Sequence, residues 1–560
     1  MKGRFAAIGV VIAITAAGAA TVSAGTHSTA ESRLDKINHI VMIYEENHSF
    51  DNLYGGWEGV NGRANADAAH TTQVDQQGNP YTCLRQNDVN LTSPPLGTTC
   101  TDSAHGFSSA FGNTWFTIDD FIQPTDTTCP PALHAFSFPN GVLNGTGEPG
   151  GCTRDLVHAF YQEQYQLNGG QQNRYMVGSD AIGMTMGAYD TKQLPVYEYL
   201  HSHGAPHYAI ADNFFQSAFG GSFLNHQYFV AARAPADPNA PADQHSLIDS
   251  AGFPRTTYPL YTPDPTATYR DGPFTVTCPS PVQGLACGNW AVNTMQPSFE
   301  PQGTFGKILV PQTHATIGDR LTAGGVTWAW YSGGWADATG DVGGPGWTNG
   351  TGPTCSNPVH DPAFTFPKCP SAIFQYHHQP LVYFQNFAPG TEGRTHLQDE
   401  AVFQNLLASS TKNSCALDSV SFVKPMGSEN EHPGYASVEQ GGSHLVSLLK
   451  SIEGSGCSKD TMVIVTYDEF GGQWDHVPPP GQTGGPAGPH DEFGPGTRIP
   501  ALVIAPRLQG NFVVDHTEHD TLSILSTIEH RFGLSPLTAR DAEVSDLSSV
   551  WEAKQVSARP

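Results

Sequence analysis

The chain has 560 residues and a formal net charge of −26, because its 52 Asp and Glu residues outnumber its 26 Lys and Arg residues. A surface this acidic repels nucleic acid and anionic membranes at long range, so we expect neither as a partner. The 60 glycines and 43 prolines predict a loop-rich globular protein rather than a coiled coil or a low-complexity chain.

The first 24 residues have the pattern of a signal peptide. Lys2 and Arg4 precede an apolar run over residues 5–20, and the small residues Val22-Ser23-Ala24 form a cleavage site. An uncleaved membrane anchor is the alternative. No later run reaches the roughly 20 apolar residues that span a bilayer. We therefore predict a secreted or periplasmic protein without stable membrane insertion, whose residues 25–560 form a single domain.

Ten cysteines follow the leader, an even number that favours disulfides outside the cytoplasm. We expect them to pair as sequential couples, although the sequence does not fix the connectivity. A zinc site is the competing interpretation, and the absence of any Cys-x-x-Cys pair in the sequence disfavours it. The cysteines are Cys83, Cys100, Cys129, Cys152, Cys278, Cys287, Cys355, Cys369, Cys415 and Cys457.

Short apolar runs predict buried strands over residues 40–44, 326–331, 462–467 and 501–505. Between and after the last runs, apolar residues recur at helical spacing. One stripe is Leu445, Leu448, Leu449 and Ile452, and the other is Leu522, Leu525, Ile528 and Phe532, with Asp520 as a candidate cap and Gly533 as a stop.

This alternation of strands and helices predicts an α/β fold with a mostly parallel sheet covered on both faces. Residues 57–150, 235–320 and 333–395 lack the alternation and carry seven of the ten cysteines. We interpret these stretches as disulfide-rich loop insertions that shape the rim of a site. A separate small domain is the alternative, but no linker composition marks one.

Two acidic clusters follow predicted strands directly. Glu46 and Asn47 come after the strand 40–44, and Asp468 and Glu469 come after the strand 462–467. Ligand sites in open parallel sheets form beyond the carboxyl ends of the strands, so the two clusters would meet if their strands are neighbours. Their oxygens suit a divalent cation. The alternative is that each cluster is a solvated turn or a helix cap.

The segment Gly220-Gly221-Ser222 is the candidate nucleophile turn. Two glycines allow the backbone to approach a ligand closely, and a helix that follows would direct its first N–H groups at an anion. Ser222 is then placed to attack phosphorus. The alternative is a plain glycine turn with Ser222 as a helix cap. Leu224 stands where the serine-esterase motif G-x-S-x-G requires glycine, which excludes that motif.

Most of the 24 histidines are expected to be surface or structural residues, including His377-His378, His516 and His519. His158 and His432 lie in more informative segments, Asp155-Leu156-Val157-His158 and Asn430-Glu431-His432. Either could hold a phosphoryl oxygen or protonate a leaving alcohol.

Seven segments resemble, in order, those of the bacterial phosphoesterase family that contains secreted acid phosphatases and non-specific phospholipases C, within the alkaline-phosphatase-like superfamily. They are HIVMIYEENHSFDNLYG (39–55), DLVHAFYQEQYQLNGG (155–170), IADNFFQSAFGGSFLNHQYF (210–229), SFVKPMGSENEHPGY (421–435), VIVTYDEFGGQWDHVPPP (463–480), FGPGTRIPALVIAP (493–506) and DHTEHDTLSILSTIEHRFGL (515–534).

The resemblance implies an αβα sandwich with a site for one divalent metal ion. Carried onto matching positions, it implies that Ser222 is the nucleophile and that Asn47, His158 and His432 contact the phosphate of a small ester. The implied metal ligands are Glu46, Asn47, Ser222, Asp468 and Glu469. The Glu469 position carries Asp in some relatives, so this ligand could approach the metal differently.

The segment from Gly221 to Asn225 resembles the acid phosphatase branch, because the phospholipase branch has a Gly-x-Thr-Asn-Pro-Asn type of segment here. Bulky Phe223 and Leu224 are expected to restrict the space for a second alcohol. The alternative is that both face the core, as apolar residues at a helix start often do, and do not affect specificity. We therefore expect a metal-dependent phosphoric monoester hydrolase that acts through a phosphoserine intermediate. The alternatives are a phospholipase C-type phosphodiesterase and a secreted binding protein on the same scaffold, which the intact set of site residues disfavours.

Overall fold

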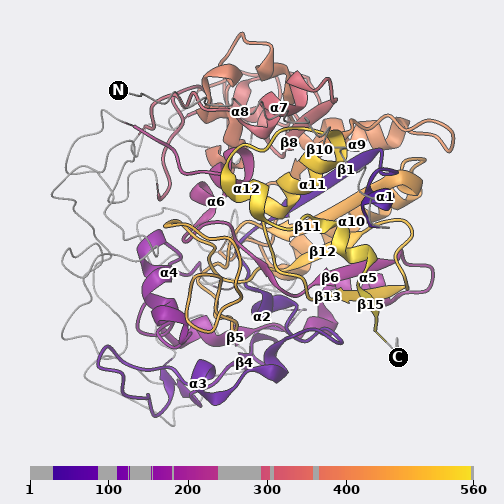
Figure 1. The fold of residues 1–560 in the computed structure, drawn as a ribbon. Helices are drawn as coiled ribbons and strands as arrows, with labels where there is room; N and C mark the ends of the chain where they lie inside the picture. The colour runs from indigo at the N-terminus through magenta and orange to yellow at the C-terminus, as the bar shows by residue number, and fades with distance from the viewer. Residues whose placement is uncertain are drawn as a thin grey trace, which may run out of the picture.

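A nine-stranded sheet lies at the centre of the described part of the chain in the computed structural model (Figure 1). Its strand order is β15-β13-β6-β12-β11-β1-β10-β8-β9. The structure describes residues 30–85, 110–123, 125, 153, 155–179, 182–237, 292–302, 308–356, 365–371, 373–434 and 436–556. The strands are β1 (His39–Glu45), β6 (Tyr208–Ala211), β8 (Trp328–Ser332), β9 (Leu397–Gln398), β10 (Val420–Lys424), β11 (Thr461–Tyr467), β12 (Ala501–Ile504), β13 (Phe512–Asp515) and β15 (Lys554–Gln555).

Seven of these strands run in one direction, while β12 and β15 run in the other. The prediction of a mostly parallel sheet is therefore confirmed. The apolar run 501–505 does form a strand, but β12 is antiparallel to both of its neighbours, β11 and β6. An apolar run reports burial on both faces rather than direction, so this reversal has no signal in the sequence.

Helices cover both faces of the sheet. Phe229 of α6 (Ser222–Ala231) packs against Tyr44 and Phe422, with ring centroids 4.9 and 5.6 Å apart. Phe403 of α9 (Glu400–Ser409) packs at 5.5 Å against Tyr331, whose side chain points to the opposite face of the pleat. Helices α5 (Pro195–His201) and α10 (Val438–Gly454) accompany α9, whereas α7 (Ile317–Ala323), α11 (Leu522–Phe532) and α12 (Ala539–Glu543) accompany α6. The predicted αβα sandwich is confirmed.

Both predicted apolar stripes form helices. In α10 the four stripe residues are buried, and the helix begins after Ser437, whose side chain accepts the N–H of Gln440. The helix α11 ends at Gly533 with φ +64°, as its sequence predicts. Its capping position is Thr521 rather than Asp520, but the Asp520 carboxylate still accepts the N–H of Leu522 at 2.6 Å.

Two disulfides join sequential cysteines, Cys355 to Cys369 and Cys415 to Cys457, as expected. Cys83 is also disulfide-bonded. The remaining cysteines and the predicted leader 1–24 lie outside the described residues. No helix among the described residues is long and apolar enough to span a membrane.

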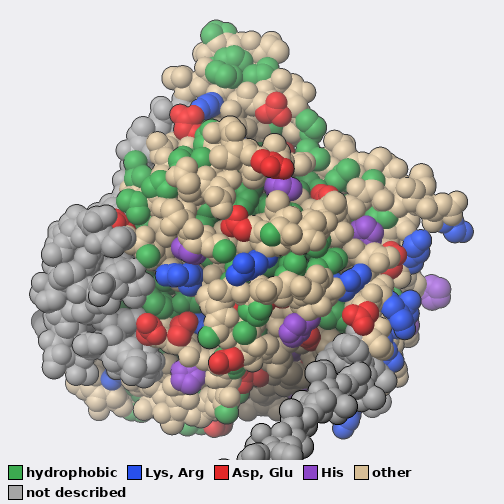
Figure 2. Space-filling view, turned by 45° about the horizontal axis from the view of Figure 1, so that its top comes forward, with side chains coloured by type: hydrophobic (Ala, Val, Ile, Leu, Met, Phe, Trp, Pro, Cys, Tyr) green, Lys and Arg blue, Asp and Glu red, His purple; other side chains and the backbone are tan. Residues whose placement is uncertain are grey.

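Acidic and basic side chains are interspersed on the face shown in Figure 2, although acidic residues predominate in the whole sequence. The exposed large hydrophobic side chains in the described part are Ile308, Val310 and Val342. The expectation that the protein has no nucleic-acid partner stays a prediction.

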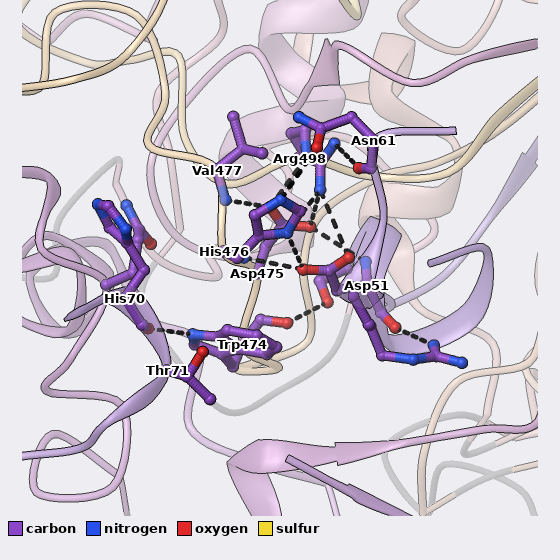
Figure 3. A network of polar contacts seen from close by, with 12 residues as sticks. Asp51, Asn61, His70, Thr71, Trp474, Asp475, His476, Val477 and Arg498 are labelled. Atoms are coloured by element: carbon purple, nitrogen blue, oxygen red, sulfur yellow. Dashed lines mark hydrogen bonds and ion pairs between the residues drawn. The ribbon is translucent and has the colours of Figure 1, made fainter. Parts of the chain in front are cut away.

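A buried arginine fastens the loops that leave the carboxyl edge of the sheet (Figure 3). Arg498 donates to Asp475 through Nε at 2.8 Å and Nη2 at 3.1 Å, and Asp475 in turn accepts the N–H of Asp51 at 3.0 Å. His476 Nδ1 lies 2.5 Å from Asp51 Oδ2. Arg498 also donates to the carbonyl of Asp212 at 2.7 Å, just beyond β6.

Because Arg498 neutralises two buried carboxylates, we expect Arg498→Met to lower the free energy of unfolding by about 3–5 kcal/mol. Urea unfolding of wild type and variant measures this loss. As a control, Lys459→Met removes an exposed cation and should change stability by less than about 0.5 kcal/mol. A loss below about 1 kcal/mol in the Arg498 variant would show that the network does not depend on the guanidinium.

Candidate active site

The two acidic clusters meet at one edge of the sheet. Strands β1 and β11 are adjacent and parallel, with Glu45 opposite Tyr467, so the residues that follow them lie side by side. The N–H of Asn47 donates to Asp468 Oδ1 at 3.0 Å, with Asn47 in the left-handed region at φ +58°. Glu46, Asn47, Asp468 and Glu469 are all fully buried. The expected convergence of the clusters is therefore observed.

Ser222 is the first residue of α6 and faces these clusters. Its hydroxyl donates to Glu46 Oε2 at 3.1 Å and lies 3.4 Å from Asn47 Oδ1. The preceding Gly220 has φ +89°, and a Cβ on it would lie 2.6 Å from the Cα of Phe160. The helix cap is Gly221, without a side-chain hydrogen bond. Hence Ser222 does not cap the helix, and its hydroxyl points into the site.

Phe223 and Leu224 do not line the site. Their side chains are 1% and 0% exposed, and the Phe223 ring packs 5.3 Å from that of Tyr383. The expectation that they restrict the space for a second alcohol is wrong. Successive residues on a helix point about 100° apart, so a Ser222 that faces the site turns the next two side chains into the core.

His158 and His432 both direct Nε2 toward the acidic clusters. In each ring Nδ1 lies 2.6 Å from a backbone carbonyl, of Leu156 and Pro433 respectively, which assigns the Nδ1 proton to that contact. The Nε2 atom of His432 lies 3.1 Å from Asn47 Nδ2, and that of His158 lies 3.5 Å from Glu469 Oε1. The structure thus brings all the predicted site residues together.

Four further residues of the site were not predicted. Lys424 Nζ contacts Glu46 Oε1, and His378 Nε2 lies 2.9 Å from the same oxygen. His226 Nδ1 lies 2.8 Å from the Ser222 carbonyl, and the His377 ring lies 5.4 Å from the His226 ring.

Two of the four had a readable signal. Lys424 ends β10, the strand on the other side of β1, so it lies at the same carboxyl edge as the acidic clusters. His226 follows Ser222 by one helical turn and so lies on the same face of α6. His377 and His378 are buried in an irregular region, in the short 3-10 helix η8 (Tyr376–His378). The pair was expected to be surface or structural; it is buried, and His378 contacts the site at Glu46.

Charge is unevenly distributed in the site. Burial raises the pKa of Asp468 well above its usual value, and the charge of Glu46 raises it further. Burial and the charge of Asp468 raise the pKa of Glu469. Burial acts on Glu46 in the same direction, but Lys424 and His378 hold its pKa well below its usual range. The site thus contains three carboxyl groups, those of Glu46, Asp468 and Glu469, and one ammonium group, that of Lys424.

The neighbouring imidazoles do not compensate for this charge. Burial lowers the pKa of His226 and His377 well below the ordinary value, and it lowers that of His378 to about 4. These three rings are therefore neutral at physiological pH and offer lone pairs rather than positive charge.

The residues fit a divalent cation. Asp468 Oδ2 and Glu469 Oε1 are buried, and neither accepts a hydrogen bond from the described residues. Ligand atoms of Glu46, His226 and Asp468 lie within 4.8 Å of one another. A buried carboxylate oxygen without a donor is costly unless a cation neutralises it. Asp51, Asp475 and His476 form a similar cluster, but Arg498 already supplies the positive charge there.

If Asp468 is a metal ligand, Asp468→Asn should remove most bound metal and lower activity at least about a hundredfold, because a neutral amide binds a hard cation weakly. Elemental analysis after gel filtration measures metal per chain. Asp541→Asn is the control, since Asp541 is equally buried but caps α12. Equal metal content in the Asp468 variant and wild type would remove Asp468 from the ligand set.

Comparison with known proteins places the chain in a family. The profile of the phosphoesterase family matches residues 37–535. Phospholipase C B of Mycobacterium tuberculosis is 24% identical over 546 residues, which cover 92% of this chain and 78% of that protein. Non-specific phospholipase C6 of Arabidopsis thaliana is 30% identical over 145 residues, 23% of this chain and 28% of that protein.

A solved structure is also similar in part. It is a protein in the alkaline phosphatase superfamily from Vibrio parahaemolyticus, with 13% sequence identity, 66% coverage of each chain and a TM-score of 0.26. The span matched by the family profile runs from just before β1 to just beyond α11 and includes every site residue named above. The chain therefore belongs to the phosphoesterase family and is an enzyme that hydrolyses phosphoric esters.

Proposed function

We propose that this chain is a secreted or periplasmic, metal-dependent phosphoric monoester hydrolase in which Ser222 is the nucleophile. The observation that carries the proposal is the position of the Ser222 hydroxyl. It lies at the N-terminus of α6, 3.1 Å from Glu46 Oε2 and 3.4 Å from Asn47 Oδ1. An attacking oxygen is thus held between a phosphate-binding helix end and a set of buried carboxylates.

The phosphoryl group would be bound from several directions. The first turn of α6 lacks a side-chain cap, so its N–H groups are available to an anion. Asn47, in the loop that follows β1, can donate through Nδ2 to a second phosphoryl oxygen. His158 and His432, whose ring centroids are 6.4 Å apart, lie beside these donors. Together these groups match the three terminal oxygens of a phosphoric monoester.

A divalent cation held by Glu46, Asn47, Ser222, Asp468 and Glu469 would lower the pKa of the serine hydroxyl and offset the charge of the transferring phosphoryl group. His226 is near enough to Asp468, at 3.7 Å, to join or to orient this set. Lys424 pairs with Glu46 and holds that carboxylate in place.

The reaction proceeds in two displacements. Ser222 Oγ passes its proton to Glu46 Oε2, which accepts its hydrogen bond, and forms a bond to phosphorus, while the bond to the leaving alcohol breaks and its electron pair stays on the alcohol oxygen. His158 is the more exposed of the two histidines, so we assign it to protonate the departing alcohol. Water then attacks the phosphoserine and gives a proton to His158, and phosphate leaves as Ser222 recovers its own proton from Glu46.

Phosphodiester hydrolysis of the phospholipase C type is the second candidate. Relatives that cover 92% of this chain carry that name, and the steric argument from Phe223 and Leu224 does not hold. Monoester hydrolysis is supported by the Gly221–Asn225 segment and by the number of donors around Ser222. The two candidates share the nucleophile and differ in the space beside it.

Removal of the nucleophile gives the first test. Ser222→Ala should lower kcat on p-nitrophenyl phosphate at least about a thousandfold and leave the fold intact, because the hydroxyl makes no core contact. The control is Ser217→Ala, in the loop just before the nucleophile turn. The Ser217 hydroxyl is buried and lies 3.5 Å from Asp520, away from the site, so its loss should change kcat less than about threefold. More than a few per cent of wild-type activity in Ser222→Ala would assign the nucleophile elsewhere.

Paired substrates decide between the candidates. We expect kcat/KM to be at least about tenfold higher for p-nitrophenyl phosphate than for p-nitrophenyl phosphorylcholine, which corresponds to roughly 1.4 kcal/mol of transition-state stabilisation. A monoester dianion offers three terminal oxygens to the donors around Ser222, whereas a diester offers two and leaves one donor without an acceptor. Equal or inverted efficiencies would favour the phospholipase C candidate, and absence of turnover on both would contradict the monoesterase proposal.

A further inference from the structure

We propose that Glu163, together with Gln216, is a positioning residue that fixes the nucleophile turn relative to the loop of Asp468 and Glu469. This inference rests on the proposed role of Ser222. Neither Glu163 nor Gln216 touches the cluster of candidate metal ligands through a described contact, and neither belongs to the predicted site. Both lie behind the site, where the helix α4 (Phe160–Leu167) passes the glycine turn.

Glu163 is fully buried and both of its carboxylate oxygens are occupied. Oε2 accepts the N–H of Gly220 at 2.5 Å and Gln216 Nε2 at 2.9 Å. Oε1 accepts the N–H and the hydroxyl of Thr497 at 2.7 and 2.8 Å. No Lys, Arg or His within the described ranges forms an ion pair with it. Burial of a carboxylate that is contacted only by neutral donors costs free energy, so its presence indicates a specific role.

Gln216 extends the connection to the acidic loop. Its Nε2 donates to the carbonyls of Ala218 and Gly220 at 2.7 and 3.1 Å. Its Oε1 accepts the N–H of Phe470 at 2.9 Å. Phe470 directly follows Glu469, so one pair of side chains binds both the nucleophile turn and the end of the acidic cluster. A shift of either segment would break hydrogen bonds at Gln216.

The glycine turn needs such an anchor. Gly220 and Gly221 have no side chains to pack, and glycine loses more conformational freedom on folding than any other residue. A Cβ on Gly221 would lie 2.9 Å from the His158 ring, so a bulkier residue cannot stiffen the turn. The carboxylate of Glu163 holds the backbone of Gly220 instead. Because α4 begins two residues after His158, Glu163 also ties that histidine to the turn.

Glu163→Gln tests this role with a side chain of the same shape. The amide nitrogen cannot accept a hydrogen bond, so one set of donors, either Gly220 and Gln216 or Thr497, loses its acceptor. Fewer hydrogen bonds then hold the turn in place. We expect kcat on p-nitrophenyl phosphate to fall about a hundredfold, as for a nucleophile displaced by about 1 Å. KM should stay within about threefold and metal per chain should be unchanged, since the ligands are untouched.

The matched control is Asp541→Asn. Asp541 is also fully buried and accepts two backbone N–H groups and a threonine hydroxyl, from Leu537 and Thr538, at 2.7, 2.7 and 2.8 Å. Its replacement should lower stability to a similar degree and leave kcat within about threefold of wild type. A role of Glu163 in folding alone predicts that both variants lower kcat equally, which would overturn the proposal.

Glu163→Asp covers the case in which the glutamine variant does not fold. It keeps the charge but withdraws the oxygens by one methylene, so we expect a kcat below that of wild type by about tenfold. Wild-type kcat in a folded Asp or Gln variant would refute the positioning role while Ser222→Ala stays inactive. If Ser222→Ala keeps its activity, the proposed function fails first, so the two failures are distinguishable.

Discussion

Three carboxylates buried side by side at the end of two neighbouring strands are the constraint on which the site depends. Glu46, Asp468 and Glu469 are fully excluded from solvent, and the ammonium of Lys424 pairs with Glu46. Repulsion among them would disfavour this arrangement in the absence of further positive charge. The parallel pairing of β1 and β11 imposes the proximity, and the proposed divalent cation would offset it. Under the proposed function, relief of this repulsion would contribute to metal affinity.

Buried carboxylates in and around the site are stabilised in three ways. Lys424 neutralises Glu46 directly. Arg498 neutralises Asp475 and Asp51, and so holds together the loops that follow β1 and β11. Glu163 has no counter-charge in the described structure and relies on neutral donors from two segments, the loop before α6 and the segment of Thr497. Each device fixes backbone as well as charge, which is what a site built on loops requires.

The sequence was most informative where a residue sits at a fixed place relative to a buried strand or a helix. The apolar runs located β1, β8, β11 and β12, and the acidic residues that follow β1 and β11 therefore marked the site. The same rule, applied to the end of β10, places Lys424 at this edge of the sheet. The sequence could not show the direction of β12, because a strand buried on both faces has the same apolar pattern in either direction. The sequence could not place His377 and His378, which reach Glu46 through an irregular segment, and it left open whether Phe223 lines the site or faces the core.

The central claim is that Ser222 carries the phosphoryl group between the two displacements. Rapid mixing with substrate, acid quench and mass spectrometry of the peptide that contains residues 210–229 tests it most directly. The account predicts a burst of phosphoserine on Ser222 that precedes the release of phosphate and is absent when metal has been removed. Full turnover without any phosphorylated peptide, or a phosphoryl group on another residue, would contradict it.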